Sequence, residues 1–167
     1  MRRITVALAG NPNSGKTTLF NHLTGARQQV GNYPGVTVEW KEGVRAAGDV
    51  ELHWVDLPGT YSLTAYSEEE LVARDYLLGG RPDVVVDVVD ASNLERNLYL
   101  TTELMELGLP LVVVLNMSDV ARARGVDIDT AALGRRLGAP VVAAVGSRGE
   151  GLDRMQAAVL ELASRNG

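Results

Sequence analysis

The stretch RITVALAGNPNSGKTT, residues 3–18, decides the fold of this chain. A short apolar run at 4–9 is typical of a strand, a glycine-rich loop follows at once, and a helical pattern begins at about residue 15. In this order, backbone N–H groups of the loop and the N-terminus of the helix surround phosphate oxygens. We therefore predict a phosphate-binding loop made of Gly10, Asn11, Pro12, Asn13, Ser14, Gly15, Lys16, Thr17 and Thr18.

Two side chains of this loop carry its chemistry. Lys16 should reach the β- and γ-phosphates of a nucleotide, and the Thr17 hydroxyl should ligate Mg²⁺. The alternative is a glycine-rich turn that matches G-x-x-x-x-G-K-T by chance. The strand before the loop and the helix after it favour the nucleotide site.

The rest of the chain alternates short β-branched runs with longer helical patterns. Residues 36–46 and 50–56 are joined by a Gly-Asp turn and should form an antiparallel hairpin, whereas residues 25–37 fit neither period and are predicted as a long loop. The pattern predicts an α/β fold with a six-stranded, mostly parallel sheet, one antiparallel hairpin strand and helices on both faces. Strands are predicted at 4–9, 36–46, 50–56, 84–90, 110–116 and 140–144, and helices at about 15–24, 67–79, 95–107, 129–137 and 151–164.

Composition narrows the class of protein. The chain has 167 residues, which suits one domain, and a formal net charge of −5, which argues against binding along a nucleic-acid backbone. It has no cysteine for a disulfide or a thiolate metal site. Its apolar runs are too short to cross a bilayer and its start does not resemble a signal peptide, so we expect a single domain over residues 1–167 in the cytoplasm.

The tetrapeptide DLPG, residues 56–59, ends the third predicted strand. At that position Asp56 can hold Mg²⁺ through water, and the Gly59 N–H can meet the γ-phosphate, with Leu57 and Pro58 between them. On its own the pattern D-x-x-G would indicate only a surface turn. Its place at the carboxyl end of a strand after a phosphate-binding loop favours the nucleotide site.

The tetrapeptide NMSD, residues 116–119, ends the fifth predicted strand. The Asp119 carboxylate can accept the N1–H and N2–H₂ donors of guanine, which adenine lacks, while Asn116 supports the O6 and N7 side and Met117 gives an apolar contact. The alternative is a plain helix N-cap at Ser118 or Asp119. The loop after the sixth strand, with Gly146, Ser147 and Arg148, could bring backbone N–H groups to guanine O6.

Several of these stretches together resemble the G domain of ferrous iron transport protein B, a family of prokaryotic iron transporters. The stretches are GNPNSGKTTLFNHLTG from Gly10, GNYPGVTVEWKEG from Gly31, DLPGTYSL from Asp56, DASNLERNLYLTTELMELGLPLVVVLNMSD from Asp90 and RLGAPVV from Arg136. The resemblance runs from Ile4 to about Leu160. It implies a Ras-like P-loop G domain that binds GTP and GDP and hydrolyses GTP slowly.

The resemblance also implies a larger context. In that family the G domain lies on the cytoplasmic side of the inner membrane, followed by a helical domain and a multi-spanning region. This chain is therefore expected to be an excised soluble domain whose GTP cycle regulates or gates Fe²⁺ uptake. Its expected partners are those two regions, with no nucleic acid, and the full-length protein is a possible homo-oligomer.

The hydrolysis machinery departs from that of Ras-type GTPases, in which a glutamine after D-x-x-G orients the attacking water. Here Thr60 holds that position and is too short for the task, and Arg27 is the nearest candidate for an arginine finger. A monovalent cation beside the phosphates could supply the missing charge. The resemblance implies that Asn13 and carbonyls of the loop 25–37 ligate K⁺. The alternative for Asn13 is a side chain that bonds the local backbone. For Asn11 we expect a local role in the turn.

Thr37 completes the expected catalytic set of Asn13, Lys16, Thr37 and Gly59. In GVTVE its hydroxyl would join Mg²⁺ only when a γ-phosphate is present, and would thereby order the loop. The stretch GNYPGVT carries Tyr33 where the family often has tryptophan.

Three other functions would also use a phosphate-binding loop. A ribosome- or tRNA-associated GTPase would be expected to carry a basic extension and the pattern N-K-x-D, and the chain has neither. A regulatory binding module with negligible turnover stays open because Thr60 replaces glutamine. A small-molecule P-loop kinase would not explain the NMSD pattern at 116–119.

Overall fold

A computed structural model of the chain describes residues 2–166, with side chains up to residue 165. The strands are β1 (Arg2–Gly10), β2 (Gln28–Asn32), β3 (Glu39–Ala47), β4 (Val50–Asp56), β5 (Val84–Asp90), β6 (Leu111–Asn116) and β7 (Val141–Ala143). The α-helices are α1 (Lys16–Thr24), α2 (Glu68–Asp75), α3 (Leu94–Glu106), α4 (Ser118–Ala123), α5 (Thr130–Leu137) and α6 (Leu152–Asn166). A π-helical turn, Tyr76–Gly80, continues α2. No helix within residues 2–166 is long and apolar enough to cross a membrane.

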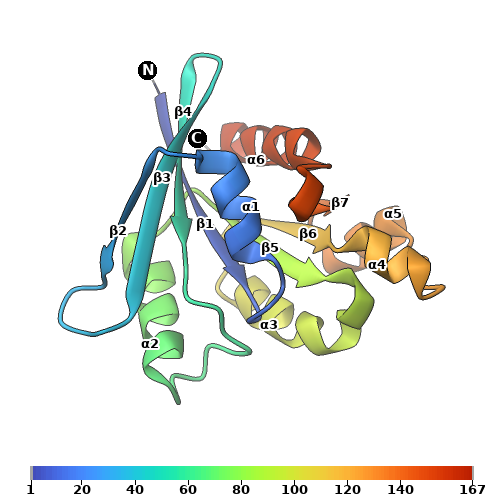
Figure 1. Cartoon of the computed structure of the whole chain (residues 1–167), viewed down its shortest axis with the longest axis horizontal. Coiled ribbons are helices and arrows are strands. Elements are labelled where there is room, and N and C mark those ends of the chain that lie inside the picture. Colours follow the sequence, from blue (N-terminus) through green and yellow to red (C-terminus); the bar gives the residue numbers. More distant parts are fainter. Residues whose placement is uncertain (1, 167) are drawn as a thin grey trace.

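The strands form one sheet in the order β2-β3-β4-β1-β5-β6-β7 (Figure 1). The pairs β2–β3 and β3–β4 are antiparallel, and all other pairs are parallel. Parallel pairing requires crossover connections, and helices lie between β4 and β5, between β5 and β6, and between β6 and β7. The predicted α/β class, the hairpin β3–β4 and the helices on both faces are confirmed.

Two apolar layers hold the helices to the sheet. Successive residues of a strand point to opposite faces, and along β1 the side chains of Val6 and Leu8 join one layer while Ala7 and Ala9 join the other. The first layer contains buried residues of α1 and α6, and the second contains buried residues of α2, α3 and α4. The site therefore rests on a sheet that is covered on both sides.

The sheet has seven strands, so the prediction of six is wrong. The additional strand β2 lies inside the predicted loop 25–37 and pairs antiparallel with β3. Its residues are mostly exposed, because it is an edge strand with no layer on either side. Such a strand carries no apolar alternation, and this is why the periodicity of the sequence does not reveal it.

Other boundaries differ by a few residues. Strand β3 begins at Glu39 and not at residue 36, so Thr37 and Val38 remain in the loop between β2 and β3. The predicted helix 67–79 is split into α2 and the π-helical turn. Helix α4 was not predicted, because six residues are too few to show a helical period.

Candidate functional site

The loop 10–15 has a glycine at each end, and only glycine fits at these two positions. A Cβ atom on Gly10 would lie 2.6 Å from the carbonyl oxygen of Val88, and Gly15 has a φ of 87°, in the left-handed region. Helix α1 starts directly after Gly15 with no side chain capping its N–H groups. Those donors remain available for an anion, as the phosphate-binding prediction requires.

The loop borders a cleft of about 370 Å³. Its lining residues are Asn11, Pro12, Asn13, Gly15, Lys16, Thr17, Thr18 and Gly59. All but Gly59 come from the predicted phosphate-binding loop, and Gly59 comes from DLPG. The structure thus brings these two motifs together, because β1 and β4 are adjacent and parallel and both end at this edge.

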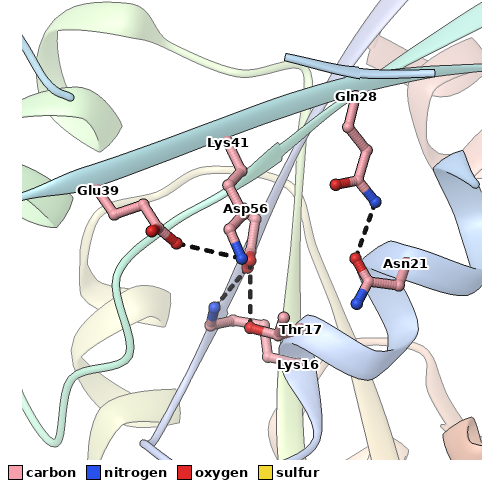
Figure 2. A network of polar contacts seen from close by, with 7 residues as sticks. All are labelled: Lys16, Thr17, Asn21, Gln28, Glu39, Lys41 and Asp56. Carbon is pink, nitrogen blue, oxygen red and sulfur yellow. Dashed lines mark hydrogen bonds and ion pairs between the residues drawn. The ribbon is translucent and has the colours of Figure 1, made fainter. Parts of the chain in front are cut away.

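Lys16 and Asp56 form a buried ion pair at the bottom of this region, and the Thr17 hydroxyl donates to the same carboxylate over 3.3 Å. Figure 2 shows Lys16 and Thr17, at the start of α1, reaching Asp56 from the end of β4, with the ion pair of Lys41 and Glu39 on β3 beside them. Hydroxyl and carboxylate oxygens are the ligands that Mg²⁺ prefers. The chemistry of this corner therefore fits a divalent cation next to a phosphate.

A second cleft, of about 290 Å³, adjoins the first along Lys16, Thr17 and Gly59. It brings the exposed Thr37 into one cavity with Thr17 and Asp56. The other lining residues are Val38, Glu39, Lys41, Leu57, Pro58 and Glu69. The three predicted Mg²⁺ ligands thus share one cleft.

A third cleft, of about 250 Å³, adjoins the first along Gly15 and Thr18. The remaining lining residues are Asn116, Met117, Asp119, Val120, Val145, Gly146 and Ser147. All of them belong to the NMSD stretch and the loop after β7, together with their neighbours. The residues predicted to contact a base therefore lie together, directly beside the phosphate-binding loop.

Asn116 connects the third cleft to the predicted phosphate-binding loop. It is 3% exposed, its Nδ2 donates to the carbonyl oxygen of Ser14 over 2.9 Å, and its Oδ1 accepts from the N–H of Gly146 over 2.8 Å. An amide NH₂ has two donors, so one remains for a ligand such as N7 of a purine. This bridging position could not be derived from the sequence, because it depends on three segments far apart in the chain.

Met117 and Asp119 also line the third cleft. Met117 has a φ of 59°, a conformation that non-glycine residues take rarely and that is enriched at functional sites. The Asp119 carboxylate is 30% exposed and lies 3.7 Å from the guanidinium of Arg148, which is itself 62% exposed. Arg148 was predicted to contact the nucleotide, and in this structure it lies over the carboxylate expected to recognise the base.

Tyr33, at the start of the loop 33–38, packs against Trp40 of β3. Its ring centroid lies 5.0 Å from that of Trp40, and Trp40 lies 5.0 Å from Tyr76 of the π-helical turn. The aromatic side chain at position 33 therefore holds the loop that carries Thr37 against the end of α2.

The two asparagines of the loop differ in environment. Asn13 is exposed, lines the phosphate cleft and has a φ of 66°. Asn11 is 5% exposed, and its backbone carbonyl accepts from the Ser14 N–H over 3.2 Å, as in a turn. Its side-chain Oδ1 has no hydrogen-bond partner among the residues that the structure describes, and neither does the buried hydroxyl of Ser14.

One buried acid lies outside the clefts. Asp87 of β5 is 1% exposed and accepts a hydrogen bond from the Thr101 hydroxyl of α3. Burial raises the pKa of Asp87 from 3.8 to about 7, and the Thr101 hydrogen bond lowers it in part. The sequence did not single out this residue, because a lone aspartate in VVVDVVD carries no motif.

Comparison with known proteins identifies what the chain is similar to. The sequence profile of the family described as "Ferrous iron transport protein B" matches residues 4–159. The Fe(2+) transporter FeoB of Salmonella typhimurium is 56% identical over 163 residues, which cover 95% of this chain and 21% of that protein. The chain therefore spans about a fifth of the length of this curated relative.

Solved structures agree with the family match. The crystal structure of the G domain of T. maritima FeoB has a TM-score of 0.91 at 45% identity, and the match covers 97% of this chain and 99% of that one. The cytosolic domain of T. maritima FeoB in a GDP form has a TM-score of 0.96 at 45% identity, covering 99% of this chain and 65% of that one.

Proposed function

We propose that this chain, which belongs to the family of ferrous iron transport protein B, binds GTP and GDP and hydrolyses GTP slowly with the help of Mg²⁺. The observation that carries the proposal is the order of the three adjoining clefts. The residues proposed to hold the metal, the phosphates and the base line three clefts that follow one another along one edge of the sheet. The GDP form of the similar T. maritima domain supports the same ligand for this chain.

The triphosphate would lie in the phosphate cleft against the loop N–H groups. Lys16 would exchange its ion pair with Asp56 for the β- and γ-phosphates, and the Gly59 N–H would meet the γ-phosphate. The Thr17 hydroxyl, Asp56 and Thr37 have the oxygen chemistry to hold Mg²⁺, which neutralises phosphate charge when bound. In this assignment Thr37 joins only in the GTP state, so loop 33–38 reports whether a γ-phosphate is present.

The base would be guanine. The Asp119 carboxylate would accept from N1–H and N2–H₂, the free N–H of Asn116 would donate to N7, and the N–H groups near Ser147 would meet O6. Arg148 would have to move away from Asp119 for this to happen. Adenine would present a lone pair to the carboxylate, and an unpaired buried polar group is strongly unfavourable.

Asn13 is the proposed K⁺ ligand. Its exposed side chain lies at the phosphate cleft, and an amide carbonyl is an oxygen ligand that suits a weakly hydrated cation. A cation there would take the place of an arginine finger. The alternative, a turn residue with no ion, is compatible with its left-handed backbone.

The whole transporter is a wider proposal. This chain covers 21% of its S. typhimurium relative, so a membrane-embedded region and a helical domain would account for parts of the remaining length. The domain would then lie on the cytoplasmic side of the inner membrane, where its GTP cycle would regulate or gate Fe²⁺ uptake. Self-association would be a property of that full-length protein.

Titration calorimetry with GDP and ADP tests the base assignment. We expect GDP to bind, with ADP weaker by at least about a hundredfold, since unpaired polar groups cost that much in a site built for hydrogen bonds. Asp119→Ala should remove most of the GDP affinity, while Glu150→Ala, a change of a neighbouring exposed acid that contacts the same Arg148, should leave it intact. Equal affinity for the two nucleotides would contradict the assignment.

A further inference from the structure

The loop 57–67, which follows β4 and begins with LPGTYSL, is held by one face of α3. The Arg96 guanidinium lies over the Tyr61 ring, 4.9 Å from its centroid. Both carboxylate oxygens of Glu103 accept from the Leu63 N–H, at 3.2 and 3.3 Å. Arg96 and Glu103 are seven residues apart, about two helical turns, and therefore lie on the same side of the helix.

Helix α3 is itself fixed to the sheet, so these two contacts have a rigid base. The buried Asn97 side chain accepts from the Asp90 N–H over 3.2 Å and donates to the Asn93 carbonyl over 2.8 Å. One turn later Thr101 bonds to Asp87 of β5. A displacement of the α3 backbone that carries Arg96 and Glu103 would disturb these buried contacts as well.

The other side of the same loop touches the phosphate-binding loop. The Thr60 N–H donates to the Gly10 carbonyl over 3.1 Å, and a Cβ atom on Gly59 would lie 3.1 Å from Cα of Pro12. Residues 59–63 are thus held between Gly10 and Pro12 on one side and α3 on the other. Thr60 is too short to orient the attacking water with its side chain. The position of the loop backbone at this point therefore matters more, and the surrounding residues fix it.

We propose that Arg96 and Glu103 are positioning residues for GTP hydrolysis. Their contacts with Tyr61 and Leu63 fix the backbone at Gly59 and Thr60 against the phosphate cleft, where a side-chain glutamine is missing. The inference rests on the proposed GTPase function. Neither residue touches the nucleotide cleft, so they act through the loop and contribute little to nucleotide affinity.

Steady-state GTP turnover by alanine variants tests the inference. We expect kcat to fall about fivefold for Arg96→Ala and about tenfold for Glu103→Ala, in line with a partly exposed cation–π contact and a charge-assisted hydrogen bond. KM and GDP affinity should stay within about twofold, because neither residue contacts the nucleotide in the ground state or the transition state. Glu95→Ala and Glu106→Ala, on exposed positions of the same helix, are the matched controls and should leave kcat unchanged.

Conservative variants separate positioning from a general loss of structure. Tyr61→Phe keeps a ring for Arg96 and Glu103→Gln keeps an acceptor for the Leu63 N–H, so both should retain most of the turnover, whereas Tyr61→Ala should match Arg96→Ala. The double variant with Tyr61→Ala and Arg96→Ala should lose no more than either single variant, since the two side chains form one contact.

The outcomes distinguish the two levels of the proposal. Wild-type turnover with unchanged kcat in Arg96→Ala and Glu103→Ala would overturn the positioning role alone. No turnover by the wild type would overturn the proposed function. In that case hydrogen exchange still tests the contact: the Leu63 amide should exchange faster in Glu103→Ala than in Glu106→Ala, and equal exchange would show that Glu103 does not hold the loop.

Discussion

Lys16 and Asp56 form a buried ion pair, which would have to separate for Lys16 to contact phosphates as proposed. A buried charge without a partner costs several kcal/mol, so neither group can simply be released. Mg²⁺ and a triphosphate offer each group a new partner of the right sign at the same moment. This exchange explains at the level of single residues why the metal and the nucleotide are expected to bind together.

Asp87 predicts a pH dependence of stability at the residue scale. Its pKa is about 7 in the folded chain against an ordinary value of 3.8, because the carboxyl is buried. Below pH 3.8 both states hold the proton and no stability is lost. As the pH rises from 3.8 to 7 the unfolded chain releases its proton first, so the folded state is progressively destabilised, by roughly 4 kcal/mol as an upper bound above pH 7.

Thermal and urea unfolding at pH 4 to 8 measures this effect. The stability of Asp87→Asn relative to the wild type should increase across that window, because the amide has no proton to lose. Asp153→Asn, at an exposed position of α6, is the control and should show no such trend. A difference between Asp87→Asn and the wild type that stays constant from pH 4 to 8 would contradict the prediction.

At the scale of elements, the loop between β2 and β3 connects the second cleft, which Thr17, Thr37 and Asp56 line, to the end of α2. Thr37 lies in the cleft, and Tyr33, Trp40 and Tyr76 form the aromatic contacts that anchor the loop. If Thr37 joins Mg²⁺ as proposed, the loop should move with it and the environment of the Trp40 indole should change. The other tryptophan, Trp54, is fully buried in the core and should not respond.

Tryptophan fluorescence should therefore distinguish the GTP-bound state from the GDP-bound state. The emission of the domain with Mg²⁺ and a non-hydrolysable GTP analogue should differ from that with Mg²⁺ and GDP. Trp40→Phe should abolish the difference and Trp54→Phe should keep it. The prediction fails if both nucleotides give the same spectrum, or if the difference survives Trp40→Phe.

The elements that the sequence predicts are those with a strong period or a motif. Buried strands such as 84–90 and the helix 95–107 were found within a residue or so, because burial on both faces or on one face leaves a clear pattern. Strand β2 was missed because an exposed edge strand has no such pattern. Residues with motif spacing could be assigned to the clefts in advance, whereas the bridge made by Asn116 and the contacts of Arg96 and Glu103 depend on tertiary packing.

At the scale of the whole molecule, the three clefts lie along the carboxyl edge of one sheet. Parallel strands β1, β4 and β6 end there in Gly10, Asp56 and Asn116, so three short motifs far apart in sequence meet at one surface. Loop 57–67 and the loop between β2 and β3 leave this edge toward α3 and α2. Under the proposed function, a change at the γ-phosphate would therefore reach α2 and α3, which cover the same face of the sheet.

The most direct measurement is GTP turnover by the purified 167-residue domain in KCl and in NaCl at equal ionic strength, with Mg²⁺ present. We predict Mg²⁺-dependent turnover that is stimulated at least about tenfold by K⁺, as expected for a cation that replaces an arginine finger in part. Asn13→Ala should lose the stimulation and keep the slow basal rate. Equal rates in both salts would make Asn13 a turn residue. A lack of turnover in both salts would contradict the assignment of this domain as a GTPase.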